Sequence, residues 1–304
     1  MKQICVGGVL PASAVSLGCM RINTLQEGEA VALLATAMEK GIDFFDHADI
    51  YGGGESERMF ARAVKSAGIP RERMRIQSKC GIRPGCYDFS REHILSAVEG
   101  SLKRLETDYL DVLLLHRPDT LMEPEEVAEA FDRLHAAGKV RYFGVSNQNP
   151  LQMELLGSFL HQKLIANQLQ FGPAHTGMID AGLHVNMTDA PAAVRDGGVL
   201  EYCRLKGITI QPWSPYQYGF FQGVFLGSEK YPELNRVLKE LAAEKGVSES
   251  ALVIAWILRH PAHMQPIVGT TKAARLADIC RGAQVELTRE EWYAVYLAAG
   301  NTLP

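Results

Sequence analysis

The stretch Gly41-Ile42-Asp43-Phe44-Phe45-Asp46-His47-Ala48-Asp49-Ile50-Tyr51-Gly52 indicates how this chain folds. Its first half is short, apolar and aromatic, which is typical of a buried strand that begins after Gly41. Its second half leads into Gly52–Gly54, so the strand ends in a loop. Asp46 and Tyr51 are therefore predicted at the carboxyl end of a buried strand, where active sites gather in parallel α/β folds.

A carboxylate and a phenol at that position suggest proton-transfer chemistry. The structural alternative is that Asp46 caps a helix and that Tyr51 packs a loop. The stretch alone does not decide between the two, because short motifs often arise without function.

The composition limits the classes of protein that this chain can belong to. Its 304 residues are an ordinary length for one α/β barrel, and a hydrophobic content of 47% is ample for a large core. The net charge of −4 offers no basic face for nucleic acid or anionic lipid. The six cysteines are scattered without a CxxC pair, which favours free thiols in a reducing compartment.

The chain carries no predicted membrane segment. Its first residues, Met1–Cys5, lack the apolar region of a signal peptide, and no run approaches the ~20 apolar residues that span a bilayer. We therefore expect a soluble, cytoplasmic protein with no membrane or nucleic-acid partner.

Strands and helices alternate along the chain. After a hairpin and a first strand that ends at Gly18, we expect strands at 42–46, 74–78, 111–115, 140–144, 164–168, 208–212 and 266–268. The predicted helices are 28–40, 55–67, one capped by Ser90, one from Pro124 to Gly138, one opened by Asn149-Pro150, one ending at Gly207, 232–245, 249–260, 272–281, and one from Thr288 to about 299. A loop of over twenty residues is expected after 164–168.

This alternation predicts one α/β domain over residues 1–304. It is a single (β/α)8 TIM barrel with an N-terminal hairpin and two additional helices, one before strand eight and one at the C-terminus. A doubly wound open sheet is the competing fold, but no G-x-G-x-x-G follows the first strand.

Polar and aromatic residues stand at the carboxyl ends of seven predicted strands. Each alone has an ordinary structural explanation, such as a hydrogen-bonded core histidine, but their joint occurrence at one rim is harder to explain that way. They are Asp46, Tyr51, Lys79, His116, Ser146, Asn147, Asn167, Gln168, Trp213, Ser214, Pro215, Gly269, Thr270, Thr271 and Lys272.

Four of these residues suit the reduction of a carbonyl. A tyrosine phenol, with a pKa near ~10, is a poor acid at neutral pH, and an ammonium beside it lowers that pKa. Lys79 can supply the ammonium to Tyr51, and Asp46 can hold Lys79 charged. His116 as a neutral imidazole can donate a hydrogen bond to a carbonyl oxygen.

Such a site needs an electron source that the chain itself lacks. Trp213 can stack on a flat heteroaromatic ring, and Ser146, Asn147 and Gln168 can bind a carboxamide. These features suit a nicotinamide.

In order and spacing the motifs resemble those of the aldo-keto reductase family, and in particular its bacterial YdhF-like branch. The resemblance covers essentially the whole chain. It rests on Gly41-Ile42, Phe45-Asp46 through Tyr51-Gly52, Ser78-Lys79, Leu115-His116, Gly144-Val145-Ser146-Asn147, Asn167-Gln168, Trp213-Ser214-Pro215 and Ile267-Val268-Gly269.

The resemblance implies an NADP(H)-dependent enzyme that reduces aldehydes or ketones. It implies a catalytic tetrad of Asp46, Tyr51, Lys79 and His116, with Tyr51 as general acid, and NADP(H) extended across the barrel mouth. The implied cofactor contacts are Ser146, Asn147 and Gln168 on the carboxamide, Trp213 stacked on the ring, Ser214 and Pro215 as further contacts, and Gly269, Thr270, Thr271, Lys272 and Arg275 at the adenosine 2′-phosphate.

Other functions remain as alternatives. A catalytically idle NADP(H)-binding regulatory or sensor subunit has no need of Tyr51 or His116. A Schiff-base lyase would need an unprotonated Lys79, which Asp46 opposes. His47 and Asp49 lack a third ligand for a metal, so no metal site is predicted. Aromatic residues in the loops favour an apolar carbonyl substrate without choosing one, and the oligomeric state stays open.

Overall fold

Eight parallel strands form the central sheet of the protein. A computed structural model describes all residues, 1–304, and the strands lie in the order β11-β10-β9-β8-β5-β4-β3-β14. The backbone N–H of Gln265 donates to the carbonyl of Ile210 at 3.0 Å and so links the two outer strands of that order. The strands are β3 (Ser16–Gly18), β4 (Phe44–Asp46), β5 (Arg75–Cys80), β8 (Leu110–Leu115), β9 (Val140–Ser146), β10 (Leu164–Gln170), β11 (Thr209–Trp213) and β14 (Ile267–Val268).

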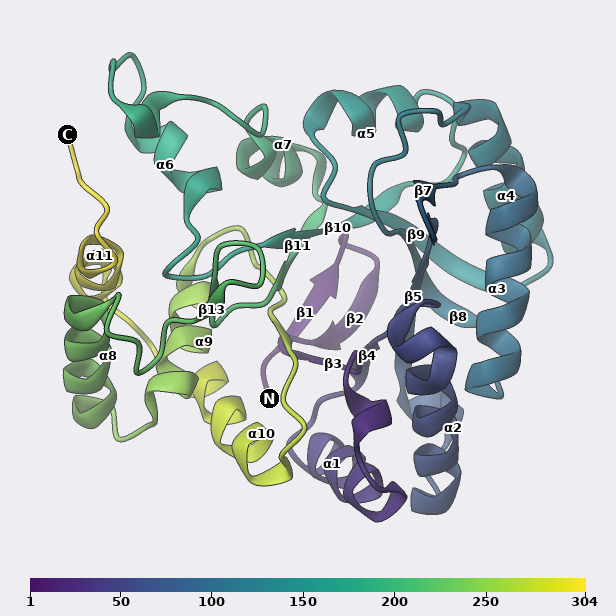
Figure 1. Cartoon of the computed structure of the whole chain (residues 1–304), viewed down its shortest axis with the longest axis horizontal. Helices are drawn as coiled ribbons and strands as arrows, with labels where there is room; N and C mark the ends of the chain where they lie inside the picture. Colours follow the sequence, from purple (N-terminus) through teal and green to yellow (C-terminus); the bar gives the residue numbers. More distant parts are fainter.

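Helices surround this barrel, as Figure 1 shows. The predicted (β/α)8 TIM barrel is confirmed, with extra helices before the eighth strand and at the C-terminus. The helices are α1 (Glu27–Glu39), α2 (Glu55–Ala67), α3 (Arg91–Leu105), α4 (Pro124–Ala136), α5 (Pro150–Gly157), α6 (Gly177–Leu183), α7 (Val199–Lys206), α8 (Pro232–Glu244), α9 (Glu249–Arg259), α10 (Ala273–Ile279) and α11 (Arg289–Ala298). No helix is both long and apolar enough to cross a bilayer.

Side-chain caps begin several helices where the sequence predicts them. The Ser90 hydroxyl accepts from the backbone N–H of His93 at the start of α3. Asn149 with Gln152, and Thr288 with Glu291, form capping boxes for α5 and α11. Each cap satisfies backbone donors that a helix terminus leaves unpaired.

The N-terminal hairpin of β1 (Gln3–Val6) and β2 (Leu10–Ser13) covers the amino ends of the strands and lies at the centre of Figure 1. Gly7 at its turn has φ +59°, and an added Cβ would stand 2.4 Å from Cβ of Ile165, so only glycine fits there. The Gly7 N–H donates to Oγ1 of Thr209 at 2.9 Å, and Nζ of Lys163 donates to the Gly7 carbonyl at 3.0 Å. Because the hairpin closes this end, the carboxyl rim is the open end of the barrel.

Two short hairpins and five 3₁₀ turns complete the structure. The hairpins lie in loops after β5 and β11, near the rim. The elements are β6 (Ile82–Arg83) with β7 (Cys86–Tyr87), β12 (Gln217–Tyr218) with β13 (Gly223–Val224), η1 (Ile22–Thr24), η2 (Tyr51–Gly54), η3 (Arg71–Arg73), η4 (Ala190–Ala192) and η5 (Cys280–Gln284).

Two expectations about local structure were wrong. The long segment after β10 contains α6 and η4 rather than loop alone. α6 buries only Met178 and Ile179, which is too little apolar periodicity to read from sequence. In addition, β5 continues through Lys79 to Cys80, so Lys79 points from within a strand rather than from the loop after it.

A buried ion pair joins the helix that follows β4 to the helix that follows β5. The Glu57 side chain in α2 is fully buried, and it accepts from Nε of Arg104 at 2.7 Å and from Oγ of Ser78 at 2.7 Å. We expect Arg104→Leu to lower the free energy of unfolding by about 3–5 kcal/mol, because it leaves a buried carboxylate without its cation. Urea denaturation measures this loss.

Arg58→Leu is the matched control, since Arg58 lies in α2 next to Glu57 and pairs with Glu55 on the surface. It should cost under about 1 kcal/mol. Equal, small losses for the two variants would contradict a structural role for the Glu57–Arg104 pair.

Candidate active site

The carboxyl rim brings together the four residues predicted to be catalytic. Asp46 ends β4, Lys79 lies in β5, His116 follows β8 directly, and Tyr51 begins η2 in the loop after β4. Alternation along the strands explains this convergence, because every second side chain of a barrel strand points inward. Asp46, Lys79 and His116 are buried, and Tyr51 is half-buried.

A short chain of contacts links three of these side chains. Nζ of Lys79 lies 2.8 Å from Oδ2 of Asp46, 2.7 Å from the His47 carbonyl and 3.1 Å from the Tyr51 phenol oxygen. The ammonium therefore uses all three of its donors on protein oxygens. The ring of His116 meets that of Tyr51 edge-on, with centroids 5.9 Å apart.

Electrostatics favour a charged lysine beside a neutral phenol. Burial opposes the charge of Lys79, but Asp46 and Tyr51 more than offset it, so the pKa of Lys79 lies above its usual value. Burial raises the pKa of Tyr51, and the opposing effect of Lys79 is smaller. The prediction that Lys79 lowers the pKa of Tyr51 below its ordinary value was wrong, because burial has the larger effect. The phenol keeps its proton at neutral pH.

His116 is a neutral imidazole, as expected. Burial and the nearby charge of Lys79 lower its pKa to about 2. Its Nδ1 has no hydrogen-bond partner in the protein. A neutral ring at the rim can donate one hydrogen bond to a carbonyl oxygen without adding charge.

The interior below Asp46 holds a set of glutamines that sequence reasoning missed. Nε2 of Gln77 donates to Oδ1 of Asp46 at 2.6 Å and lies 2.9 Å from Oε1 of Gln211. Gln211 in turn donates to Gln265 at 2.9 Å, and Gln265 donates to the Ser13 carbonyl at 2.7 Å. The signal was present in the sequence, because Gln77 stands two residues before Lys79 and therefore shares its face of the strand.

Gln168, which the resemblance places at a carboxamide, also holds Asp46. Its Nε2 donates to Oδ1 of Asp46 at 3.0 Å. The other implied carboxamide residues form a chain on the rim: Ser146 Oγ donates to the Gln168 carbonyl, and Asn147 Nδ2 donates to Ser146 Oγ at 2.7 Å. Oδ1 of Asn147 accepts from Trp213 Nε1 at 3.2 Å, so the same chain orients the indole.

The segment after β14 carries exposed positive charge. Lys272 and Arg275 are exposed, whereas the Thr270 side chain is buried and accepts from the Lys272 N–H at 3.2 Å. Arg21, which sequence reasoning did not single out, donates to the Gly269 carbonyl and adds a third cation. Gly269 is exposed, Thr271 and Ser214 are half-buried, and Pro215 is buried.

His47 is a packing residue. Its ring is fully buried, both ring nitrogens lack partners, and the ring meets Phe60 edge-on at 4.4 Å. Burial lowers its pKa to about 3. The structure contains no group of three or more His, Cys, Asp or Glu side chains arranged to hold a metal ion.

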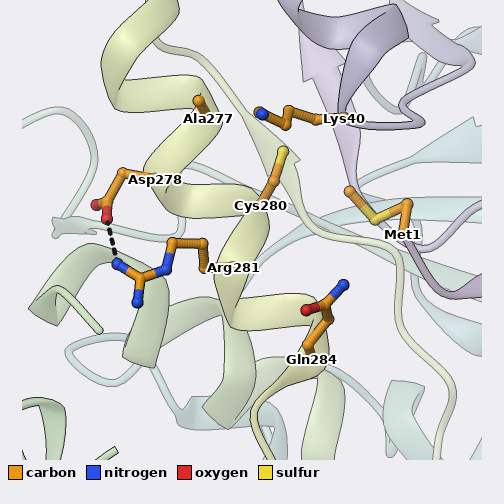
Figure 2. Close-up of a pocket in the computed structure, with 7 residues that line it drawn as sticks. All are labelled: Met1, Lys40, Ala277, Asp278, Cys280, Arg281 and Gln284. Atoms are coloured by element: carbon orange, nitrogen blue, oxygen red, sulfur yellow. Dashed lines mark ion pairs between the residues drawn. The ribbon is translucent and has the colours of Figure 1, made fainter. Parts of the chain in front are cut away.

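A separate surface cavity lies between Met1, the end of α1 at Lys40 and the segment from α10 to η5 (Figure 2). Asp278 and Arg281 form an ion pair at 3.7 Å on its wall. Burial raises the pKa of the Cys280 thiol to about 11, so the thiol stays protonated. The cavity offers no reactive group, and its lining is Met1, Lys40, Ala277, Asp278, Cys280, Arg281 and Gln284.

Comparison with known proteins identifies the family. The sequence model of the Aldo/keto reductase family matches residues 14–296. This chain belongs to that family of oxidoreductases. It is 36% identical to the uncharacterised oxidoreductase YcsN of Bacillus subtilis over the full length of both chains. It is also 36% identical to the oxidoreductase YdhF of Escherichia coli, over 89% of this chain and 87% of YdhF.

The chain is also similar to a sugar reductase and to two aldo-keto reductases of known structure. The chain is 32% identical to a 6-dehydroglucose reductase of Agrobacterium fabrum, over 98% of each chain. The thermostable aldo-keto reductase Tm1743, solved with the inhibitor epalrestat, superposes with a TM-score of 0.79 at 27% identity over 98% of this chain and 100% of its own. The fold is also that of the Bombyx mori aldo-keto reductase solved with NADP, with a TM-score of 0.76 at 22% identity over 98% and 92% of the two chains.

The buried neutral histidines make stability depend on pH. Below about pH 6.5 the unfolded chain binds protons on His47 and His116 that the folded protein, with their pKa values lowered to about 3 and about 2, does not bind. Each of these two histidines therefore lowers the stability as the pH falls, by about 1 kcal/mol per pH unit on average between pH 7 and 5. Chemical denaturation between pH 7 and 5 measures the slope.

His47→Leu isolates one of the two contributions, because the ring makes no hydrogen bond that the substitution would break. The average slope between pH 7 and 5 should fall by about 1 kcal/mol per pH unit. An unchanged slope would mean that His47 already binds a proton in the folded protein.

Proposed function

We propose that this protein is an NADP(H)-dependent reductase of aldehydes or ketones. The observation that carries the proposal is the buried contact of Lys79 with both Asp46 and Tyr51 at the open end of the barrel, beside a neutral His116. These groups supply a proton donor and a donor of one neutral hydrogen bond, and none of them is a covalent nucleophile.

The rim residues fit a nicotinamide nucleotide. The Trp213 indole can stack on the nicotinamide ring in the way it stacks here on the ring of Phe221, with centroids 5.9 Å apart and 27° between the planes. At the other end, Lys272 and Arg275 form no ion pair with a carboxylate, so their charges are available to an anion. We therefore assign Ser146, Asn147, Gln168 and Trp213, with Ser214 and Pro215, to the nicotinamide half, and Gly269, Thr270, Thr271, Lys272 and Arg275 to the 2′-phosphate.

Each of the four residues Asp46, Tyr51, Lys79 and His116 has a separate role in the proposed reaction. When bound, the reduced nicotinamide supplies a hydride to the carbonyl carbon. His116 orients the carbonyl oxygen with a hydrogen bond, and Tyr51 gives that oxygen its phenolic proton. Lys79 stabilises the phenolate as the proton leaves, and Asp46 keeps Lys79 charged throughout. The phenolate then regains a proton from solvent.

Loss of the phenol tests this assignment. We expect Tyr51→Phe to lower turnover by ~10²-fold or more, because the proton donor is gone, while NADPH affinity stays within a few-fold. Turnover is followed by NADPH oxidation with a panel of aldehydes and ketones, and affinity by fluorescence titration.

Tyr202→Phe is the matched control. The Tyr202 phenol donates to Glu154 at 2.6 Å on the outer helices, so turnover should stay at the wild-type level. Reduction by Tyr51→Phe at a near wild-type rate would remove Tyr51 from its proposed role.

Cofactor preference tests the 2′-phosphate assignment. The guanidinium of Arg275 can pair with the phosphate, which NADH lacks. We expect Arg275→Ala to weaken the binding of NADPH by about 1.5–3 kcal/mol and to leave the binding of NADH nearly unchanged. Calorimetric titration with each cofactor gives the two affinities.

Arg281→Ala serves as control, because Arg281 lies beyond the end of α10 and pairs with Asp278. It should change neither affinity. Equal losses of both cofactors in Arg275→Ala would place Arg275 away from the 2′-phosphate.

A further inference from the structure

Arg117 stands directly after His116 and is half-buried at the rim. Its guanidinium carbon lies 5.5 Å from the centre of the Trp213 ring and 5.5 Å from that of Phe220. Its charge also acts on Tyr51 and Tyr87. The guanidinium therefore sits among aromatic rings beside the proposed proton donor.

No carboxylate of the protein neutralises Arg117. Two acidic side chains near the rim are already paired: Asp46 pairs with Lys79, and Asp88 pairs with Arg83. Asp119 accepts from the backbone N–H groups of Phe89 and Leu121. Arg117 itself makes no ion pair and donates no hydrogen bond to another residue.

Arg71 shows what a structural arginine looks like in this protein. It too stacks on an aromatic ring, 3.9 Å from the centre of Tyr109. Unlike Arg117, it donates to Thr107, to the Met74 and Tyr109 carbonyls and to Asp111, with which it pairs at 2.7 Å. Its donors are satisfied within the protein, so it needs no ligand. The donors of Arg117 are free.

A half-buried guanidinium with free donors is costly unless an anion reaches it. Burial lowers the pKa of Arg117, yet an arginine stays charged in proteins. Aromatic faces compensate part of the lost hydration but accept no strong hydrogen bond. A carboxylate would accept two parallel hydrogen bonds from the paired N–H donors of the guanidinium.

We propose that Arg117 binds a carboxylate on the substrate, so that the physiological substrate is an oxo acid rather than a neutral carbonyl compound. This assignment rests on the proposed function, because the reacting carbonyl must lie at Tyr51 and His116. The carbon chain between carbonyl and carboxylate lies against Trp213 and Phe220. Arg117 is then the residue that selects among carbonyl compounds.

Two matched pairs of substrates test this. Succinic semialdehyde and butanal share a four-carbon aldehyde and differ in a terminal carboxylate, and 4-carboxybenzaldehyde and benzaldehyde differ in the same way. We expect the wild-type protein to show kcat/KM ~10–100-fold higher for the acid of at least one pair, the range of a charge-assisted hydrogen-bonded pair. In Arg117→Leu this ratio should fall toward one, mainly through a higher KM for the acid, because the neutral aldehyde has no carboxylate to lose.

Arg117→Lys should retain part of the preference for the acid, because lysine keeps the positive charge but lacks the paired N–H donors of a guanidinium. Arg236→Leu replaces an exposed arginine of α8 that pairs with Glu233 and Glu240, and it should leave the ratio at its wild-type value. Equal losses for acid and neutral aldehyde in Arg117→Leu, or a wild-type ratio near one in both pairs, would overturn the proposal.

The two proposals can fail separately. If the wild-type protein reduces neutral aldehydes but does not favour the acids, the reductase stands and the role of Arg117 falls. If it reduces none of the four, the reductase assignment fails, and calorimetric titration of 4-carboxybenzaldehyde into wild type and Arg117→Leu decides the anion site alone. Binding that the substitution abolishes supports the site, and binding of equal strength in both, or in neither, overturns it.

Discussion

The buried ion pair between Asp46 and Lys79 is the interaction on which the site depends. Taking both charges out of water is costly, and their attraction offsets that cost only where further hydrogen bonds satisfy the remaining polar atoms. Here the His47 carbonyl and the Tyr51 phenol complete the shell of Lys79, while Gln77 and Gln168 complete that of Asp46. A protein that only bound a nucleotide would have no use for so costly an arrangement.

The glutamine layer beneath the pair explains why the barrel holds it in one geometry. Gln77, Gln211 and Gln265 pass hydrogen bonds across the interior to the Ser13 carbonyl, above the apolar cluster that the hairpin closes. A register shift of one residue in β5 would turn both Gln77 and Lys79 outward. The layer therefore couples strand register to the position of the ammonium.

Sequence patterns predicted the strands and helix caps of this structure, and they missed properties that depend on how deeply a side chain is buried and on which groups surround it. The apolar run of β8 and the caps Ser90, Asn149 and Thr288 are local signals, and they were confirmed. The four tetrad residues were predicted to share one rim, because parallel strands end at the same edge. The pKa of Tyr51 was misjudged, since spacing reveals a nearby lysine but not how far burial outweighs it. Arg117 was missed because a single arginine after a strand carries no signal in the sequence. Only the structure shows that nearby acidic side chains pair with other groups.

A double-mutant cycle on Asp46→Asn and Lys79→Met tests most directly whether the pair acts as one unit. If Asp46 serves only to hold Lys79 charged and in place, each substitution should lower kcat/KM for carbonyl reduction by ~10²-fold or more. The double variant should then be no worse than the more damaging single one, because the second change removes a group that has already lost its role. Losses that multiply would mean that the two residues act independently, and would contradict the account.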